Sequence, residues 1–126
     1  MNNLTKKFAY YGSIMMAISI GLGAFGAHGL KKVISPEILE IFHTGVEYQF
    51  YHAIGLFCVA FVAYFTQSNQ VKLAGYLMIV GTFLFSGSLY IMTLTGVKWF
   101  GAITPFGGMS YIVAWIMLAL SIRKAS

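Results

Sequence analysis

The sequence is poor in charged residues, and above all in acids. Only 9% of its 126 residues are charged and three are acidic, whereas 59% are hydrophobic. Soluble domains carry about 25% charged residues, and a folded chain this small leaves much of its side-chain surface exposed. A water-soluble fold is therefore excluded, and the composition predicts an integral membrane protein.

Cysteine is nearly absent. Cys58 is the single thiol, so the chain can form neither an internal disulfide nor a CxxC redox pair. We interpret Cys58, which lies in an apolar run, as a small buried or lipid-facing residue. The net charge of +5 comes from basic residues that stand singly or in pairs between apolar runs. Because this pattern is typical of residues flanking membrane spans, it predicts no nucleic-acid partner.

Four apolar segments predict an all-α bundle of four transmembrane helices. About 20 residues at about 1.5 Å each cross a hydrocarbon core of about 30 Å. A signal peptide is the rival interpretation of the first segment, but its apolar run is too long. We expect a single integral membrane domain, residues 1–126, with spans at about 8–30, 48–65, 71–94 and 101–122.

An extra short amphipathic helix is predicted between the first and second spans. Residues 31–47 contain all three acids of the chain. Ser35 suits an N-cap, Pro36 the first helical position, and Glu37 the positive end of the helix dipole. We expect this helix to lie at the membrane surface and to bend at Gly45 into the second span.

Basic residues favour one orientation in the cell membrane. An even number of spans places both termini on one side, and that side has more lysine and arginine than the other. Since cytoplasmic segments carry the excess of basic residues, both termini are expected in the cytoplasm. The residues on the side of the termini are Lys6, Lys7, Lys72, Arg123 and Lys124, and those on the opposite side are Lys31, Lys32 and Lys98.

Small and hydroxyl residues recur at helical spacing in two spans. Small residues four apart let helix backbones approach closely in lipid, within one chain or between chains, so a homo-oligomer is plausible. Hydroxyls in lipid usually bond the carbonyl one turn back or a neighbouring helix, and we favour this over a transport path. The first stripe is Ala9, Ser13, Ala17, Gly21, Ala24 and His28, and the second is Thr82, Ser86, Tyr90 and Thr93.

The polar residues converge on one predicted layer. Counted from the expected span ends, His28 lies about 3 Å and His52 about 6 Å below the same outer boundary. A polar group at such depth needs a partner, so we expect a cluster in the outer leaflet. The candidate ligand site or polar cluster is His28, Glu47, Gln49, Tyr51, His52, Tyr90 and Thr104.

Three interpretations of this cluster stay open. It is a structural knot of mutual hydrogen bonds, a site for a ligand or a proton, or a metal site. For a metal such as zinc or copper, the candidate ligands are His28 and His52. The sequence identifies no cofactor.

Three stretches of the chain resemble domain-of-unknown-function family 423, whose members are small four-helix membrane proteins. They are Gly23–Leu30, Thr44–Ala53, and the segment from Leu84–Tyr90 through Leu94–Gly96 to Gly101–Gly108. The resemblance implies a multi-pass membrane protein with four helices and implies no activity. It covers the stretches that hold the candidate polar cluster.

Three functions are compatible with these features. The first is a binding or scaffold protein that holds a lipid, a quinone-like molecule or a partner helix. The second is a small transporter or proton-coupled carrier, which the absence of an acid buried within a span disfavours. The third is a metal-dependent membrane enzyme, but no nucleophile, base and orienting group can be named, and an enzyme is not favoured.

Overall fold

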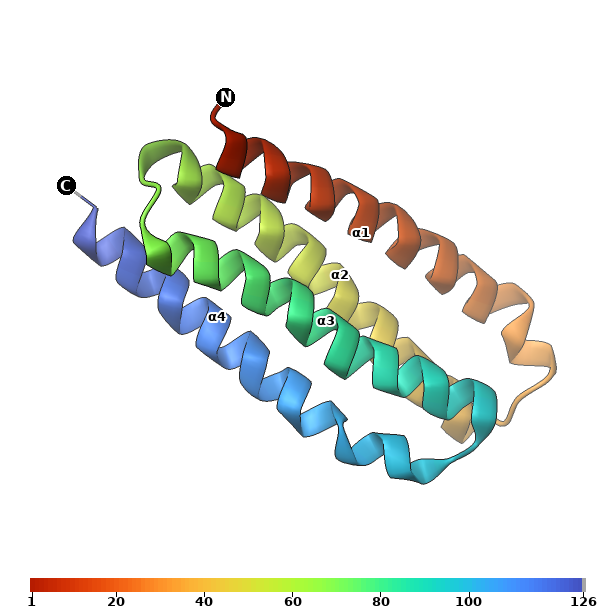
Figure 1. Ribbon diagram of the computed structural model, residues 1–126. Helices are drawn as coiled ribbons and strands as arrows, with labels where there is room; N and C mark the ends of the chain where they lie inside the picture. The colour runs from red at the N-terminus through yellow and green to blue at the C-terminus, as the bar shows by residue number, and fades with distance from the viewer. Residues whose placement is uncertain (126) are drawn as a thin grey trace.

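The computed structural model describes residues 1–125 and consists of four long helices joined by short connections. Each helical segment is long and apolar enough to cross a membrane. Both termini lie at one end of an antiparallel bundle (Figure 1), which confirms the predicted all-α four-helix architecture. The helices are α1 (Asn3–His28), α2 (Pro36–Phe65), α3 (Asn69–Thr95) and α4 (Thr104–Lys124), with 3₁₀ turns η1 (Leu30–Lys32) and η2 (Lys98–Ala102).

Local sequence signals set the helix ends. Ser35 caps α2 by accepting a hydrogen bond from the backbone N–H of Ile38, with Pro36 in the first turn, as predicted. Ser68 caps α3 in the same way. Gly96 ends α3 in the left-handed conformation, with φ of 71°, which a residue with a Cβ rarely adopts.

The predicted amphipathic helix does not form a separate element. Residues 36–47 are helical, but they are the first turns of a continuous α2. Their apolar face is covered within the bundle, because the buried ring of Phe42 packs against Gly26 of α1. Gly45 is not a bend: a Cβ there would lie 2.8 Å from the ring of Tyr90, so this glycine allows α2 and α3 to approach closely.

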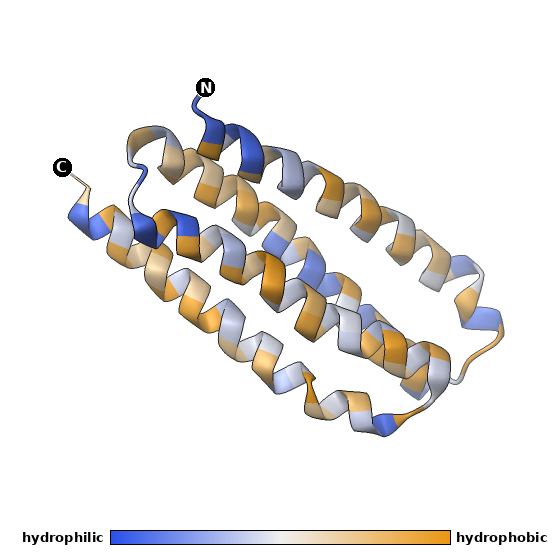
Figure 2. Ribbon diagram, in the orientation of Figure 1, coloured by the Kyte–Doolittle hydropathy of each residue, from blue (hydrophilic) through white to orange (hydrophobic). Residues whose placement is uncertain are grey.

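The helices pack in the order of the sequence. α1 packs along α2, α2 along α3, and α3 along α4, whereas α2 meets α4 at only a few positions. α1 and α3 meet near the termini, where the ring of Phe8 contacts Gly75 and Tyr76. Figure 2 shows hydrophilic residues mainly at the two ends of the bundle, with a further hydrophilic stretch part-way along α2.

Most of the small-residue stripe of α1 faces outward and packs against no other helix of the bundle, although Ala9 packs against the core. Ser13, Ala17, Gly21, Ala24 and His28 are exposed. The buried face instead includes Phe8, Gly12, Ser19 and Gly26, and a Cβ at Gly12 would lie 3.0 Å from the carbonyl oxygen of Ala53. Two faces of α1 carry small residues at helical spacing, so spacing alone could not identify the buried one. A homo-oligomer stays a prediction.

At several contacts between helices, an aromatic ring or the backbone of one helix packs directly against a glycine of the other. A Cβ at Gly75 would lie 2.3 Å from the ring of Phe8, and one at Gly81 would lie 2.5 Å from the ring of Tyr111. Phe8 is fully buried, so its ring has no room to move aside. Close van der Waals packing of this kind holds helices together in lipid, where hydrophobic burial offers little.

Replacing Gly107 by alanine should lower the free energy of unfolding by about 1–3 kcal/mol through overpacking. A Cβ there would lie 2.3 Å from the backbone nitrogen of Phe85 in α3, whereas a Cβ at the adjacent Gly108 would lie 3.9 Å from the Phe85 ring. Gly108→Ala is therefore the matched control. Thermal unfolding of the detergent-solubilised protein measures both variants, and equal midpoints would contradict the close approach of α3 and α4.

Candidate functional site

His52 joins α2 to α4 and uses both of its ring nitrogens. Its Nδ1 lies 2.8 Å from the carbonyl oxygen of Tyr48, and its Nε2 lies 3.0 Å from the indole nitrogen of Trp115. An indole N–H can only donate, so Nε2 accepts, and Nδ1 carries the hydrogen that is donated to the carbonyl. The imidazole is thus a neutral, fully bonded group, with no nitrogen lone pair left for a metal ion.

The face of the same imidazole stacks on Tyr111 of α4. The ring centroids are 3.4 Å apart and the planes are inclined by only 5°. The Tyr111 hydroxyl donates to Thr82 Oγ1 at 2.9 Å, and Thr82 in turn donates to the carbonyl of Met78 at 2.9 Å. A chain of contacts from His52 therefore connects α2, α4 and α3.

Gln49 forms a second polar bridge, between α1, α2 and α3. Its buried side chain donates from Nε2 to the carbonyl oxygen of Met15 at 3.1 Å. Its Oε1 accepts a hydrogen bond from the hydroxyl of Tyr90 at 2.6 Å. The structure thus brings Gln49 and Tyr90 together, as the sequence predicts, and adds a backbone partner that no sequence pattern identifies.

Most residues of these bridges lie near the middle of their helices, although Tyr90 lies nearer the far end of α3. Met15 is near the middle of the 26-residue α1, and Thr82 is near the middle of the 27-residue α3. His52 is near the middle of the 30-residue α2. The prediction counted the depth of His52 from residue 48, whereas α2 begins at Pro36, so His52 lies further from the start of its helix than predicted.

The remaining predicted residues lie apart from these bridges. His28 is exposed at the end of α1, so it cannot share a metal or a hydrogen bond with His52. Glu47 accepts a hydrogen bond from Tyr51 on an exposed face of α2. Thr104 pairs with Ser88 at 2.6 Å, between α4 and α3. Across residues 1–125, no three His, Cys, Asp or Glu side chains come together as metal ligands.

The hydroxyls of α3 are bonded as the sequence predicts. Thr82 and Thr93 donate to carbonyls one turn back, and Ser86 donates to the carbonyl of Gly45 in α2 at 2.6 Å. Tyr90 donates to Gln49. Each hydroxyl therefore has a structural partner, which fits the helix-packing interpretation of this stripe.

Sequence reasoning missed the contribution of α4. Tyr111 and Trp115 are one helical turn apart in the middle of the predicted span 101–122. Tyr111 is buried and Trp115 is 40% exposed, and the polar tip of such a residue needs a hydrogen-bond partner where it is surrounded by apolar groups. Their mid-span position was the available signal, since such residues usually lie at the ends of a span.

A groove of about 570 Å³ runs between α1 and α3, with Gln49 of α2 at its base. Apolar residues form most of both walls, and the Gln49–Tyr90 pair and Thr82 lie in it. Near the termini the two helices meet at Phe8 and Tyr76, whose rings are 5.4 Å apart. The residues that line the groove are Tyr11, Ile14, Met15, Ile18, Leu22, Gln49, Tyr76, Ile79, Thr82, Phe83, Gly87 and Tyr90.

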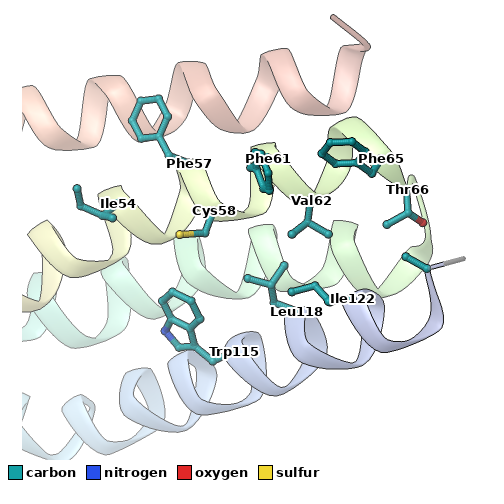
Figure 3. A pocket seen from close by; sticks show the side chains of 11 residues that line it. Ile54, Phe57, Cys58, Phe61, Val62, Phe65, Thr66, Trp115, Leu118 and Ile122 are labelled. Atoms are coloured by element: carbon teal, nitrogen blue, oxygen red, sulfur yellow. The ribbon is translucent and has the colours of Figure 1, made fainter.

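A second groove, of about 650 Å³, lies between α2 and α4 (Figure 3). Its lining is almost wholly apolar, with Phe57, Phe61 and Phe65 on α2 and Leu118 on α4. Cys58 is exposed in this groove. This agrees with the interpretation of Cys58 as an apolar residue facing lipid.

The bond between His52 and Trp115 should be measurable as an energetic coupling. A double-mutant cycle of His52→Phe and Trp115→Phe keeps both aromatic rings but removes the hydrogen bond. We expect a coupling energy of about 0.6–1.7 kcal/mol in unfolding, the range found for bonds between membrane helices. Trp99 is exposed on η2, so His52→Phe combined with Trp99→Phe should show no coupling. Equal coupling in the two cycles would contradict the bond.

Comparison with known proteins identifies a family. Residues 22–108 match the family model described as "Protein of unknown function (DUF423)". The UPF0382 membrane protein YwdK of Bacillus subtilis (strain 168) is 48% identical over 120 residues, covering 94% of this chain and 98% of the relative. The UPF0382 membrane protein SH2409 of Staphylococcus haemolyticus is 42% identical, covering 94% and 97%. No solved structure matches the chain. The resemblance found in the sequence is confirmed: the protein belongs to the DUF423 family of membrane proteins, whose function is unknown.

Proposed function

We propose that the protein binds a membrane lipid and holds one of its hydrocarbon chains in the groove between α1 and α3. The observation that carries this proposal is the groove itself. Its volume of about 570 Å³ lies within the range of about 300–1,000 Å³ that is usual for small-molecule sites. It opens on the side of the bundle, so a lipid can enter it from the bilayer.

The walls of the groove suit a hydrocarbon chain. Ile14 and Ile18 on α1 oppose Ile79 and Phe83 on α3. Gly87 lines the groove and has no side chain to fill it. A Cβ built at Gly87 would meet no atom closer than 4.0 Å, so there is open space in front of this residue. Contact with two apolar walls gives a bound chain more close contacts than it would have in fluid lipid.

The polar residues in the groove have a structural role in this proposal. Gln49 bonds to Met15 of α1 and to Tyr90 of α3, and so it bridges the two helices that form the walls. The Thr82 hydroxyl is engaged with Met78 and Tyr111. Because these groups bond to one another, they support a fixed groove for an apolar chain better than they support a site for a polar ligand.

The proposal extends to how the protein sits in the cell membrane. All four helices cross the bilayer as one domain, with both termini in the cytoplasm. The excess of basic residues at the terminal end supports this orientation, and the lengths of the apolar helices support that all four cross the bilayer.

Filling the groove should abolish lipid retention. Gly87→Phe places a ring in the groove, and Gly21→Phe is the matched control, because Gly21 is exposed and a Cβ there meets nothing within 4 Å. Native mass spectrometry of the tag-free protein in detergent should show a bound diacyl lipid in the wild type and in Gly21→Phe, but not in Gly87→Phe. Equal retention by all three proteins, or none in the wild type, would overturn the proposal.

Labelling of single cysteines tests the orientation. In a Cys58→Ser background, Val97→Cys lies on the connection between α3 and α4, and Lys124→Cys lies at the end of α4. A membrane-impermeant maleimide added to intact cells should label the cysteine at position 97 and leave the one at 124 unlabelled until the cells are opened. The reverse pattern would place the termini outside.

A further inference from the structure

The groove between α1 and α3 continues into a basic hollow at the terminal end of the bundle. Tyr11 and Tyr76 line the end of the groove nearest the termini. Tyr11 also lines a shallow hollow of about 270 Å³, together with Asn3, Lys6, Lys7 and Tyr10. The apolar groove and the hollow beside the two lysines therefore lie next to each other, on either side of Tyr11.

Lys7 and Tyr76 form a group of hydrogen-bond donors at this junction. The Lys7 ammonium lies 2.8 Å from the Tyr76 hydroxyl. An ammonium has no acceptor, so Lys7 donates and the phenol oxygen accepts. The phenol keeps its own hydrogen, and the ammonium keeps two more. Both residues thus have hydrogens to offer an anion at the mouth of the groove.

Tyr76 is held in place by a well-packed neighbour. Its ring contacts the ring of Phe8 edge to face, at 5.4 Å and 72°. Phe8 is fully buried and rests against Gly75. The contact with Phe8 orients the Tyr76 ring, while the Tyr76 hydroxyl and the Lys7 ammonium lie at the surface, where a lipid headgroup can reach them.

The charge around this mouth is of one sign. Lys6 and Lys7 are exposed near the start of α1, and no acidic side chain is near them in the sequence. All three acids lie within residues 37–47, at the start of α2, which is at the opposite end of the bundle (Figure 1). A group with negative charge is attracted to this mouth and meets no acidic side chain that repels it.

We infer that the ligand of the groove is an anionic phospholipid of the leaflet next to the termini, with its phosphate at Lys6, Lys7 and Tyr76 and one acyl chain between α1 and α3. This inference rests on the proposed function, since it names the lipid class that the groove takes. From Tyr76 to Tyr90 the groove follows α3 for about 21 Å at helical rise. One leaflet of the hydrocarbon core is about 15 Å deep, so an acyl chain that starts at the mouth fits lengthwise.

The test compares two lipids that differ only in their headgroup. The full-length, tag-free protein in neutral detergent is titrated with phosphatidylglycerol and with phosphatidylcholine of identical acyl chains, and binding is read by native mass spectrometry. Phosphatidylglycerol should bind more tightly. Lys7→Gln should weaken its binding about fivefold, the effect of about 1 kcal/mol per basic residue near an anionic lipid, and should weaken phosphatidylcholine less, because the choline cation offsets the charge of its phosphate.

Two further variants check the assignment. Tyr76→Phe removes the phenol hydrogen and should weaken both lipids, because both carry the phosphate that accepts this hydrogen bond. Lys124→Gln removes a charge from the same end of the bundle but from α4, which does not line the groove, and should change neither lipid.

Glycerol phosphate, which has the anion without the chains, should not compete at equal concentration. If it competes as well as the lipid, the site binds a free phosphate, and the inference is wrong.

The outcomes separate this inference from the function on which it rests. Equal binding of both lipids, with no effect of Lys7→Gln, would overturn the headgroup assignment and leave the groove as a lipid site. Tight, Lys7-dependent binding that survives Gly87→Phe would mean that the headgroup binds without the groove, and the proposed function would fail. No binding of either lipid to the wild type would overturn both.

Discussion

Inside a membrane, a buried polar group without a hydrogen-bond partner costs several kcal/mol, and this cost governs how the four helices are joined. α2 supplies a bond to each of the other three. Gln49 reaches the backbone of α1, the carbonyl of Gly45 accepts from α3, and His52 accepts from Trp115 on α4. Throughout residues 1–125, every buried side-chain nitrogen and oxygen has a partner.

This role of α2 accounts for how the polar centre of the bundle is bonded. A histidine could bind a metal or carry a proton, but His52 has one nitrogen bonded to a carbonyl and the other to an indole, and its face is covered by Tyr111. If Nε2 of His52 were protonated, its N–H would face the indole N–H of Trp115, and neither donor would have an acceptor. The histidine therefore contributes by connecting α2 to α4, and binding is better sought where the helices separate.

The helices separate on the sides of the bundle. Because helices consecutive in sequence pack most closely, α1 and α3 are held apart over much of their length, as are α2 and α4. Each pair leaves a lateral groove that faces the bilayer. The two grooves differ at their ends: the α1–α3 groove ends at Tyr11 and Tyr76, and Tyr76 bonds to Lys7, whereas no lysine or tyrosine among the described residues lines the α2–α4 groove.

The sequence by itself determined the class of the protein, its helices and its family. Apolar runs too long for a soluble fold specify membrane helices, and caps such as Ser35 with Pro36 act through their own neighbours in the chain. The bonding of the α3 hydroxyls was also predictable, because a buried hydroxyl has few partners to choose from. None of these features depends on which helix lies beside which.

Only the tertiary structure decided which faces meet and at what depth. A membrane helix is apolar on all sides, so no polar face marks the side exposed to lipid. The outward stripe of Ala17 and Gly21 and the inward face with Gly12 and Gly26 are therefore alike in sequence, and Trp115 has no partner until α4 lies beside α2. His52 lies near the middle of α2 because residues 36–47 continue the same helix, and they need a surface to pack against. The buried contact of Phe42 with Gly26 supplies it, and it exists only once α1 and α2 have come together.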